Sequence, residues 1–105
     1  MGQCVIACYR PRAGKESELL DLMREHLPIL RSQGLVTDRE SIIMSAADGT
    51  IVEVFEWKSQ EAIDQAHKNP VVLAMWKRYD ACCTFDSIGN LAESKEMFPH
   101  FAPIN

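Results

Sequence analysis

The chain lacks several features that would assign it to a broad functional class. None of its hydrophobic runs approaches the ~20 residues that a membrane-spanning helix needs. Its 11 Lys and Arg are outnumbered by 15 Asp and Glu, the formal net charge is −4, and neither sign is concentrated in a block. Phosphate groups are bound by clustered Lys and Arg, so we expect no nucleic acid partner. The amino-terminal MGQCVIACY has neither a basic lead nor a long apolar segment, so we expect no secretory signal, no membrane and a cytoplasmic location.

Patterns for metals, phosphates and cofactors are missing as well. No glycine-rich phosphate loop, Ser-His-Asp order or metal-ligand spacing can be assembled from the chain. Cys4 and Cys8 would lie about 13 Å apart on one face of a strand, at about 3.3 Å per residue. Cys82 and Cys83 would point to opposite faces of another strand. We therefore expect no metal and no cofactor, and interpret the four thiols as small buried side chains rather than as a disulfide or metal site.

What the chain does contain is the pattern of one small domain. Its 105 residues, 47% hydrophobic and 25% charged, fit a single globular domain over residues 1–105. Hydrophobic periodicity predicts strands at 3–9, 41–47, 50–57 and 82–88, and helices at 14–33, after 59 and at 71–80. The Asp48-Gly49 pair predicts a hairpin, and Asn69-Pro70 predicts a new helix start. Pro28 is expected to bend the first helix without ending it. Residues 91–105 are expected to form an irregular tail.

This order of elements predicts an α+β fold. Strand, helix, two strands, two helices and a last strand make a ferredoxin-like split βαβ arrangement with an antiparallel four-stranded sheet. All four strands are apolar on both faces, which a lone sheet with helices on one side does not require. The open face therefore needs a cover, and a second copy of the chain is the simplest one. We expect a homodimer that forms through the sheet face.

The motif FEWKSQEAIDQAHKNPVV, at 55–72, carries a resemblance to a known family. A strand ending in Glu-Trp, then Ser-x-Glu-Ala, a His near the end of a short helix and a proline-started helix resemble the antibiotic biosynthesis monooxygenase superfamily. The first strand, which ends in Arg10-Pro11, and a helix closed by Gly34 extend the similarity to about residues 3–90. The resemblance implies a homodimer whose two sheets pack face to face into an α/β barrel. It also implies a pocket between the first helix and the sheet.

The resemblance narrows the chemistry without naming a substrate. Some members of this superfamily are cofactor-independent monooxygenases of quinols or polyketide aromatics, and others degrade haem or have no assigned activity. The haem-degrading branch uses an Asn on the first strand, and a Trp and a His ten residues apart. Ala66 and Trp76 stand at the latter two positions here, and the first strand has no Asn. We therefore do not expect haem degradation.

The candidate site residues each allow a structural and a functional interpretation. His26 falls on the apolar arc of the first helix, where it is either a hydrogen-bonded core residue or a proton-transfer group. His67 lies at the edge of the short helix and either bonds the helix end or reaches the pocket. The aromatic residues of the third helix either fill the core or form a pocket wall that stacks a planar ligand. The hypothesis we carry forward names His26 as the candidate base and Tyr79 as a second catalytic residue, with Trp76, Val72, Met23 and His67 lining the substrate pocket.

Three carboxylates on strands need partners. Glu53 and Glu56 point to opposite faces of an otherwise apolar strand, and Asp86 lies on the last strand. A buried carboxylate is costly unless it is paired, and the nearby cations of the sequence are Arg10, Arg12 and Arg39.

The favoured function is a cofactor-independent monooxygenase of small aromatic or quinol-like compounds. Its partners would be a second copy of the chain and a small apolar or aromatic molecule. The alternative is a non-catalytic small-molecule-binding or structural protein built as the same dimeric α/β barrel.

Overall fold

The computed structural model describes residues 2–105 and has an α+β fold with three α-helices and an antiparallel sheet. The strands are β1 (Gln3–Pro11), β2 (Ile42–Ser45), β3 (Ile51–Trp57), β4 (Cys83–Asp86) and β5 (Ala102–Pro103). The helices are α1 (Glu16–Ser32), α2 (Gln60–Ala66) and α3 (Pro70–Cys82), followed by the short 3-10 turns η1 (Ile88–Asn90) and η2 (Ala92–Lys95). Within residues 2–105, no helix is long and apolar enough to span a bilayer.

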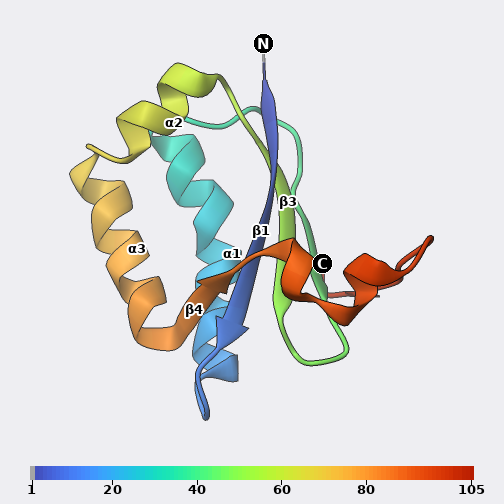
Figure 1. The fold of residues 1–105 in the computed structure, drawn as a ribbon. Coiled ribbons are helices and arrows are strands. Elements are labelled where there is room, and N and C mark those ends of the chain that lie inside the picture. The colour runs from blue at the N-terminus through green and yellow to red at the C-terminus, as the bar shows by residue number, and fades with distance from the viewer. Residues whose placement is uncertain (1) are drawn as a thin grey trace.

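The sheet forms one layer and the helices a second. The strand order is β4-β1-β3-β2-β5, and every neighbouring pair is antiparallel. α1 and α3 lie side by side against one face of the sheet, with α2 at the end of the pair (Figure 1). The carboxy-terminal segment passes to the opposite face (Figure 1).

Local capping chemistry explains where the helices begin and end. The Ser59 side chain accepts the backbone N–H of Ala62 at 3.1 Å at the start of α2. Asn69 accepts two backbone N–H groups at the start of α3, and the proline predicted for its first turn is there. α1 continues through Pro28 as expected, and Gly34 follows it with a φ of 71°, a conformation that glycine adopts without strain.

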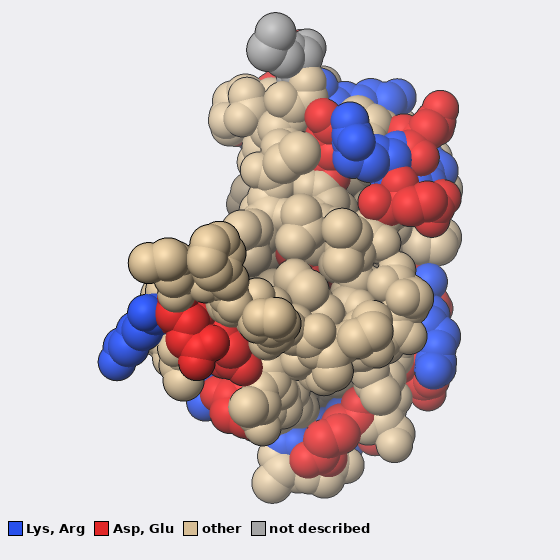
Figure 2. All heavy atoms as spheres, turned by 90° about the vertical axis from the view of Figure 1, so that its right-hand side faces the viewer, with Lys and Arg blue, Asp and Glu red and all other residues tan. Residues whose placement is uncertain are grey.

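The two faces of the sheet are covered differently. On the helix side, the odd-numbered residues of β1 and β3 pack with the helices into the main core. On the other side, the tail covers only part of the sheet: Leu91 closes a small cluster with Cys8, Ala46 and Val52. Farther along, β1 and β2 leave their apolar side chains exposed. Figure 2 views this side, where uncharged residues occupy the middle and charged ones lie mostly toward the margins.

Three sequence predictions need correction. The sheet has five strands rather than four, because the tail is not wholly irregular: Ala102–Pro103 pairs with the edge of β2. The last main strand is shorter than 82–88. Cys82 still belongs to α3, and the ladder begins at Cys83, opposite Pro11. Cys4 is exposed rather than buried, although it shares a face with Cys8, because the tail covers Cys8 and does not reach Cys4.

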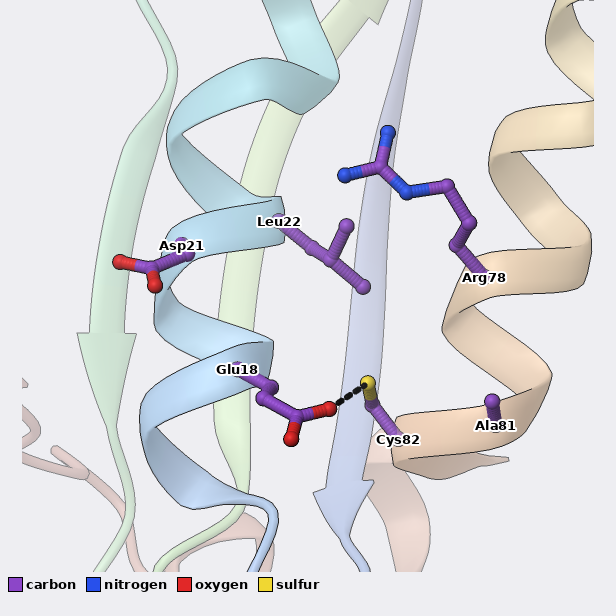
Figure 3. Close-up of a pocket in the computed structure, with 6 residues that line it drawn as sticks. All are labelled: Glu18, Asp21, Leu22, Arg78, Ala81 and Cys82. Atoms are coloured by element: carbon purple, nitrogen blue, oxygen red, sulfur yellow. Dashed lines mark hydrogen bonds between the residues drawn. The ribbon is translucent and has the colours of Figure 1, made fainter.

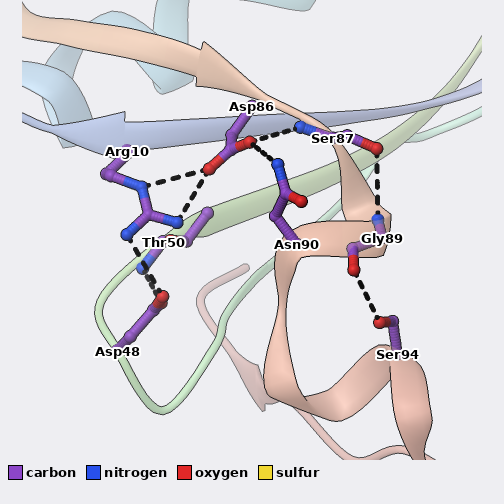
Figure 4. A network of polar contacts seen from close by, with 8 residues as sticks. All are labelled: Arg10, Asp48, Thr50, Asp86, Ser87, Gly89, Asn90 and Ser94. Atoms are coloured by element: carbon purple, nitrogen blue, oxygen red, sulfur yellow. Dashed lines mark hydrogen bonds and ion pairs between the residues drawn. The ribbon is translucent and has the colours of Figure 1, made fainter.

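A polar network holds the start of the tail against the sheet (Figure 4). Arg10 on β1 bonds the Asp86 carboxylate at 2.7 Å and lies 3.6 Å from Asp48 in the β2–β3 loop. Asp86 also accepts the Asn90 side-chain amide at 2.6 Å and the Ser87 backbone N–H at 2.7 Å. These last bonds turn the chain out of β4 and into η1, which explains why the strand ends at Asp86. The bonds to Asp86 together lower its pKa to about 2, with the Asn90 bond as the largest cause and the Arg10 bond as the next.

This lowered pKa predicts an acid-sensitive contribution to stability. Asp86 stabilises the fold above its ordinary pKa of 3.8, and that contribution is lost as the pH falls through its folded value of about 2. The difference in unfolding free energy between the wild type and Asp86→Asn should therefore be full at about pH 5 and should shrink below about pH 4. Urea denaturation across this range measures it. Asp38→Asn is the control, because Asp38 is exposed and makes no ion pair within residues 2–105. A difference for Asp86→Asn that stays constant with pH would contradict this assignment.

Candidate functional site

A carboxylate with no solvent exposure lies at the centre of the helix-covered face. Glu53, in the middle of β3, has a relative exposure of 0%. The Tyr9 hydroxyl, from β1, donates to its Oε1 at 2.8 Å. The Nδ1 atom of His26, from α1, lies 2.9 Å from Oε1 and 3.2 Å from Oε2. Glu53 thereby joins β3, β1 and α1 through polar contacts in an otherwise apolar layer.

The electrostatics of this cluster keep Tyr9 protonated. Burial raises the pKa of the Tyr9 hydroxyl well above its usual range, and the charge of Glu53 and the hydrogen bond to it raise that pKa further. Tyr9 is therefore a hydrogen-bond donor to Glu53 at any ordinary pH. A carboxylate only accepts, so with Glu53 ionised the Nδ1 of His26 carries the proton and donates it. The His26 Nε2 atom makes no hydrogen bond within residues 2–105.

The orientation of the His26 ring is fixed by aromatic neighbours. Its centroid lies 5.2 Å from that of Phe55 and 5.6 Å from that of Tyr79, with both ring pairs near perpendicular. The Tyr9 ring also meets it edge-on, at 6.3 Å. Edge-to-face contacts of this kind favour a defined ring geometry. The imidazole is therefore held both by its bond to Glu53 and by packing.

His26 forms part of the wall of a cavity of about 350 Å³ between the sheet and α3. The cavity is lined by Val5, Ala7, Tyr9, His26, Phe55, Trp57, Trp76, Asp80 and Phe85. Five of these residues are aromatic, and they come from β1, β3, α3 and β4. Val5 and Ala7 of β1 have small side chains, and larger residues at these positions would fill the space that the cavity occupies. A volume of this size suits one small aromatic molecule.

The structure brings some of the sequence-predicted site residues to this cavity and places others elsewhere. His26 and Trp76 line it. The Tyr79 hydroxyl instead donates to the Leu22 backbone carbonyl at 2.9 Å, and its ring supports Tyr9 and His26 from outside the lining. Burial raises the pKa of Tyr79, which keeps that hydroxyl protonated.

The remaining predicted pocket residues lie outside the lining as well. Val72 and Met23 are buried in the main core. His67 is exposed, and its Nδ1 lies 2.8 Å from the Ile63 carbonyl oxygen at the end of α2. Its ring contacts the Trp76 ring with centroids 5.1 Å apart, so it supports a wall residue from outside.

Several lining residues were not among the site residues predicted from the sequence. Tyr9, Phe55, Trp57 and Phe85 occupy alternate strand positions, which share the helix-covered face. That alternation is the signal that could have found them, since a cavity under the first helix is also lined by the facing strands. Asp80 follows Trp76 by four residues, the spacing that places two side chains on one side of a helix.

The partners of the three strand carboxylates are now defined. Arg39 pairs with Glu56 at 3.0 Å, and Arg10 pairs with Asp86. Arg12 binds neither of these carboxylates and donates to the Asp80 backbone carbonyl at 3.1 Å. In the described part of the chain, Glu53 contacts a tyrosine and a histidine instead of an arginine.

A second hollow, of about 340 Å³, lies between α1 and α3 (Figure 3). Its lining includes Glu18 and Arg78, and the Cys82 thiol bonds a Glu18 carboxylate oxygen at 3.5 Å. Burial and this bond to Glu18 raise the pKa of Cys82. A thiol held protonated is a poor nucleophile, so this hollow offers less chemistry than the cavity at His26. In the part of the chain that the structure describes, no cluster of three His, Cys, Asp or Glu side chains could hold a metal ion.

Comparisons with known proteins support the fold alone. No protein-family model and no curated protein matches the chain. Among solved structures, it is similar to the structure of Rv0793 from Mycobacterium tuberculosis, with a TM-score of 0.63 and 21% identity. The match covers 88% of this chain and 99% of that one, so the two share the architecture over nearly their whole length.

The buried cluster predicts that substitution of Glu53 destabilises the fold much more than substitution of Glu56, the other glutamate of β3. Glu53→Ala leaves the buried donors of Tyr9 and His26 without an acceptor, and should destabilise the fold by about 3 kcal/mol or more. Glu53→Gln should lower the stability of the fold less, because its amide oxygen still accepts a hydrogen bond from Tyr9. Glu56→Ala, on the opposite face, is the control and should lose far less, since its partner Arg39 is exposed. Chemical denaturation gives these values, and an equal loss for Glu53→Ala and Glu56→Ala would refute the role of the cluster.

Proposed function

We propose that this protein is a cofactor-independent monooxygenase of small aromatic or quinol-like compounds, with His26 as the base. The observation that carries the proposal is the His26–Glu53–Tyr9 cluster in the wall of an aromatic-lined cavity. A core histidine with a structural role needs no cavity beside it, and an apolar binding pocket needs no buried carboxylate behind an imidazole. The two features together favour proton transfer to or from a bound ligand.

The proton step follows from the geometry of the cluster. Nδ1 is occupied by Glu53, so Nε2 is the atom that accepts a proton from the hydroxyl group of a bound substrate. Glu53 stabilises the imidazolium that forms, and Tyr9 keeps the carboxylate in place by donating to Oε1. His26 and Glu53 are both buried, and burial strengthens the interaction between imidazolium and carboxylate.

The oxygen step then needs no further reductant. A quinol whose hydroxyl has lost its proton is an electron-rich anion that can reduce O₂ directly. Insertion of one oxygen atom at a ring carbon converts quinol plus O₂ into hydroxyquinone plus water. Atoms and electrons balance, since the ring supplies the electrons that reduce the second oxygen atom. His26 returns the proton that it accepted as the water forms.

The wider proposal is that the chain is a ferredoxin-like member of the antibiotic biosynthesis monooxygenase superfamily and pairs into a dimeric α/β barrel. The strand order and the motif at 55–72 support the family proposal. The open face of the sheet supports the dimer: Ile6 and Ile42 both lie beside Val54 in the register and are 54% and 57% exposed. An apolar row across three strands is a surface that a second copy would bury. Met97 and Phe98 in the tail add exposed apolar groups.

A second candidate function is a non-catalytic small-molecule-binding or structural protein of the same dimeric barrel. It is favoured by the position of Tyr79, whose hydroxyl is committed to the Leu22 carbonyl. Tyr9, the tyrosine that does line the cavity, donates its hydroxyl to Glu53, so neither tyrosine offers His26 a second proton-transfer group. Oxygen consumption separates the two candidates.

The oxygenase proposal predicts oxygen uptake that depends on His26. With naphthoquinols as substrates, the wild type should consume O₂ above the rate of autoxidation and transfer one ¹⁸O atom from ¹⁸O₂ to the product. His26→Ala should lower that rate by about 10²-fold or more, as expected for loss of a general base. His26→Gln serves if the alanine variant does not fold. His100→Ala is the control, since His100 is exposed in the tail and lies outside the cavity lining. Equal rates for the wild type and both His26 variants would remove His26 from the mechanism.

The dimer proposal predicts a matched pair of outcomes for two exposed apolar residues. Ile6→Glu places a charge in the middle of the apolar row and should shift the protein from dimer to monomer, because burial of an unpaired carboxylate is unfavourable. Leu73→Glu, a similar change at an exposed position of α3, should leave the dimer intact. Sedimentation equilibrium measures both masses. A wild type that is monomeric at micromolar concentration, or a dimer broken by Leu73→Glu and not by Ile6→Glu, would refute this interface.

A further inference from the structure

The cavity at His26 has a charged group at its opening. Among the lining residues, Tyr9, His26, Phe55 and Trp57 are buried, whereas Asp80 is exposed. Phe85, the other exposed lining residue, is the cross-strand partner of Tyr9. The buried residues form the inner end of the cavity, so the carboxylate of Asp80 and the ring of Phe85 mark its opening.

Within the described residues, no side-chain cation pairs with the Asp80 carboxylate. Asp80 makes no ion pair within residues 2–105, and the lining contains neither Lys nor Arg. Arg12 bonds the backbone carbonyl of Asp80 rather than its side chain and is not part of the lining. Arg78, two residues earlier on α3, pairs with Glu25 of α1. The opening of the cavity therefore carries a negative charge that a ligand can meet.

Aromatic faces and a carboxylate attract the same kind of ligand. A cation over the face of Trp, Tyr or Phe is drawn to the negative face of the ring, and a nearby carboxylate adds a direct charge interaction. Trp76 and Asp80 lie one helical turn apart on α3 and both line the cavity. An anionic group would meet the carboxylate of Asp80 at the opening, with no Lys or Arg in the lining to compensate.

We propose that Asp80 selects the substrate class: a hydroxyarene that carries a protonated amine on a short side chain, rather than one that carries a carboxylate. The inference rests on the proposed function, because it places the hydroxyl group at His26. The ring then lies among the aromatic residues, and the ammonium group lies at the opening, between Asp80 and Trp76. Asp80 is a specificity residue in this scheme and takes no part in proton transfer.

Three phenols of similar shape test this selection by binding alone. Tyramine carries an ammonium group, tyrosol has a neutral hydroxyl in its place, and 3-(4-hydroxyphenyl)propionate carries a carboxylate. Titration calorimetry with the wild type should show tyramine about fivefold to tenfold tighter than tyrosol, the range expected for a partly desolvated ion pair beside an aromatic ring. The propionate should bind more weakly than tyrosol. The preference for tyramine should decrease as salt is added.

The variant and its control make the test specific. Asp80→Asn should bring tyramine to the affinity of tyrosol and leave tyrosol binding unchanged. Asp64→Asn makes the same change of charge on α2, outside the lining, and should keep the preference of the wild type. A tyramine preference that persists in Asp80→Asn, the propionate as the tightest ligand, or no binding of any of the three phenols would each overturn the inference. The expected order of affinities without oxygen uptake would uphold the selection by Asp80 and remove the oxygenase proposal alone.

Discussion

The buried carboxylate of Glu53 is the constraint on which the rest of the site depends. A carboxyl group that has lost all contact with water is stable only if the protein supplies hydrogen-bond partners, and here two side chains do so. Those partners come from positions 44 and 27 residues away in the sequence. These hydrogen bonds therefore hold α1 at a fixed distance from the sheet, and they hold β1 and β3 together at Glu53. They also orient the imidazole that faces the cavity.

The cavity persists because of an imbalance of side-chain sizes around this point. Val5 and Ala7 are small, while the surrounding rings are large and rigid. Aromatic side chains have few rotamers, and those of Tyr9 and Phe55 are further restrained by their neighbours. They cannot fold inward to fill the space over Ala7. Close packing is therefore lost in this part of the main core, next to the buried His26–Glu53 hydrogen bond.

The sequence carried enough information for the α+β class and for the order of the main elements, because long periodic segments and caps such as Ser59 and Asn69 act locally. It also placed His26 on the buried side of α1. It could not identify the partners of Glu53: alternation gives the face of a strand, but a hydrogen bond to Tyr9 depends on the register between β1 and β3. The exposure of Cys4 and the strand Ala102–Pro103 depend on the path of the tail. The tail has no hydrophobic periodicity from which its path could be predicted.

Side chains along β1 point alternately to the two faces of the sheet, so this strand links both faces. Val5, Ala7 and Tyr9 face the cavity, and Ile6 and Cys8 between them face the opposite side, where Cys8 is covered by the tail and Ile6 is not. Adjacent residues of an extended strand cannot move independently, so any contact that holds Ile6 also restrains Ala7 and the cavity wall beside it. An assembly through the open face would therefore stiffen the site without contributing a residue to it. The open sheet face and the cavity are consequently separate in position and coupled through one strand.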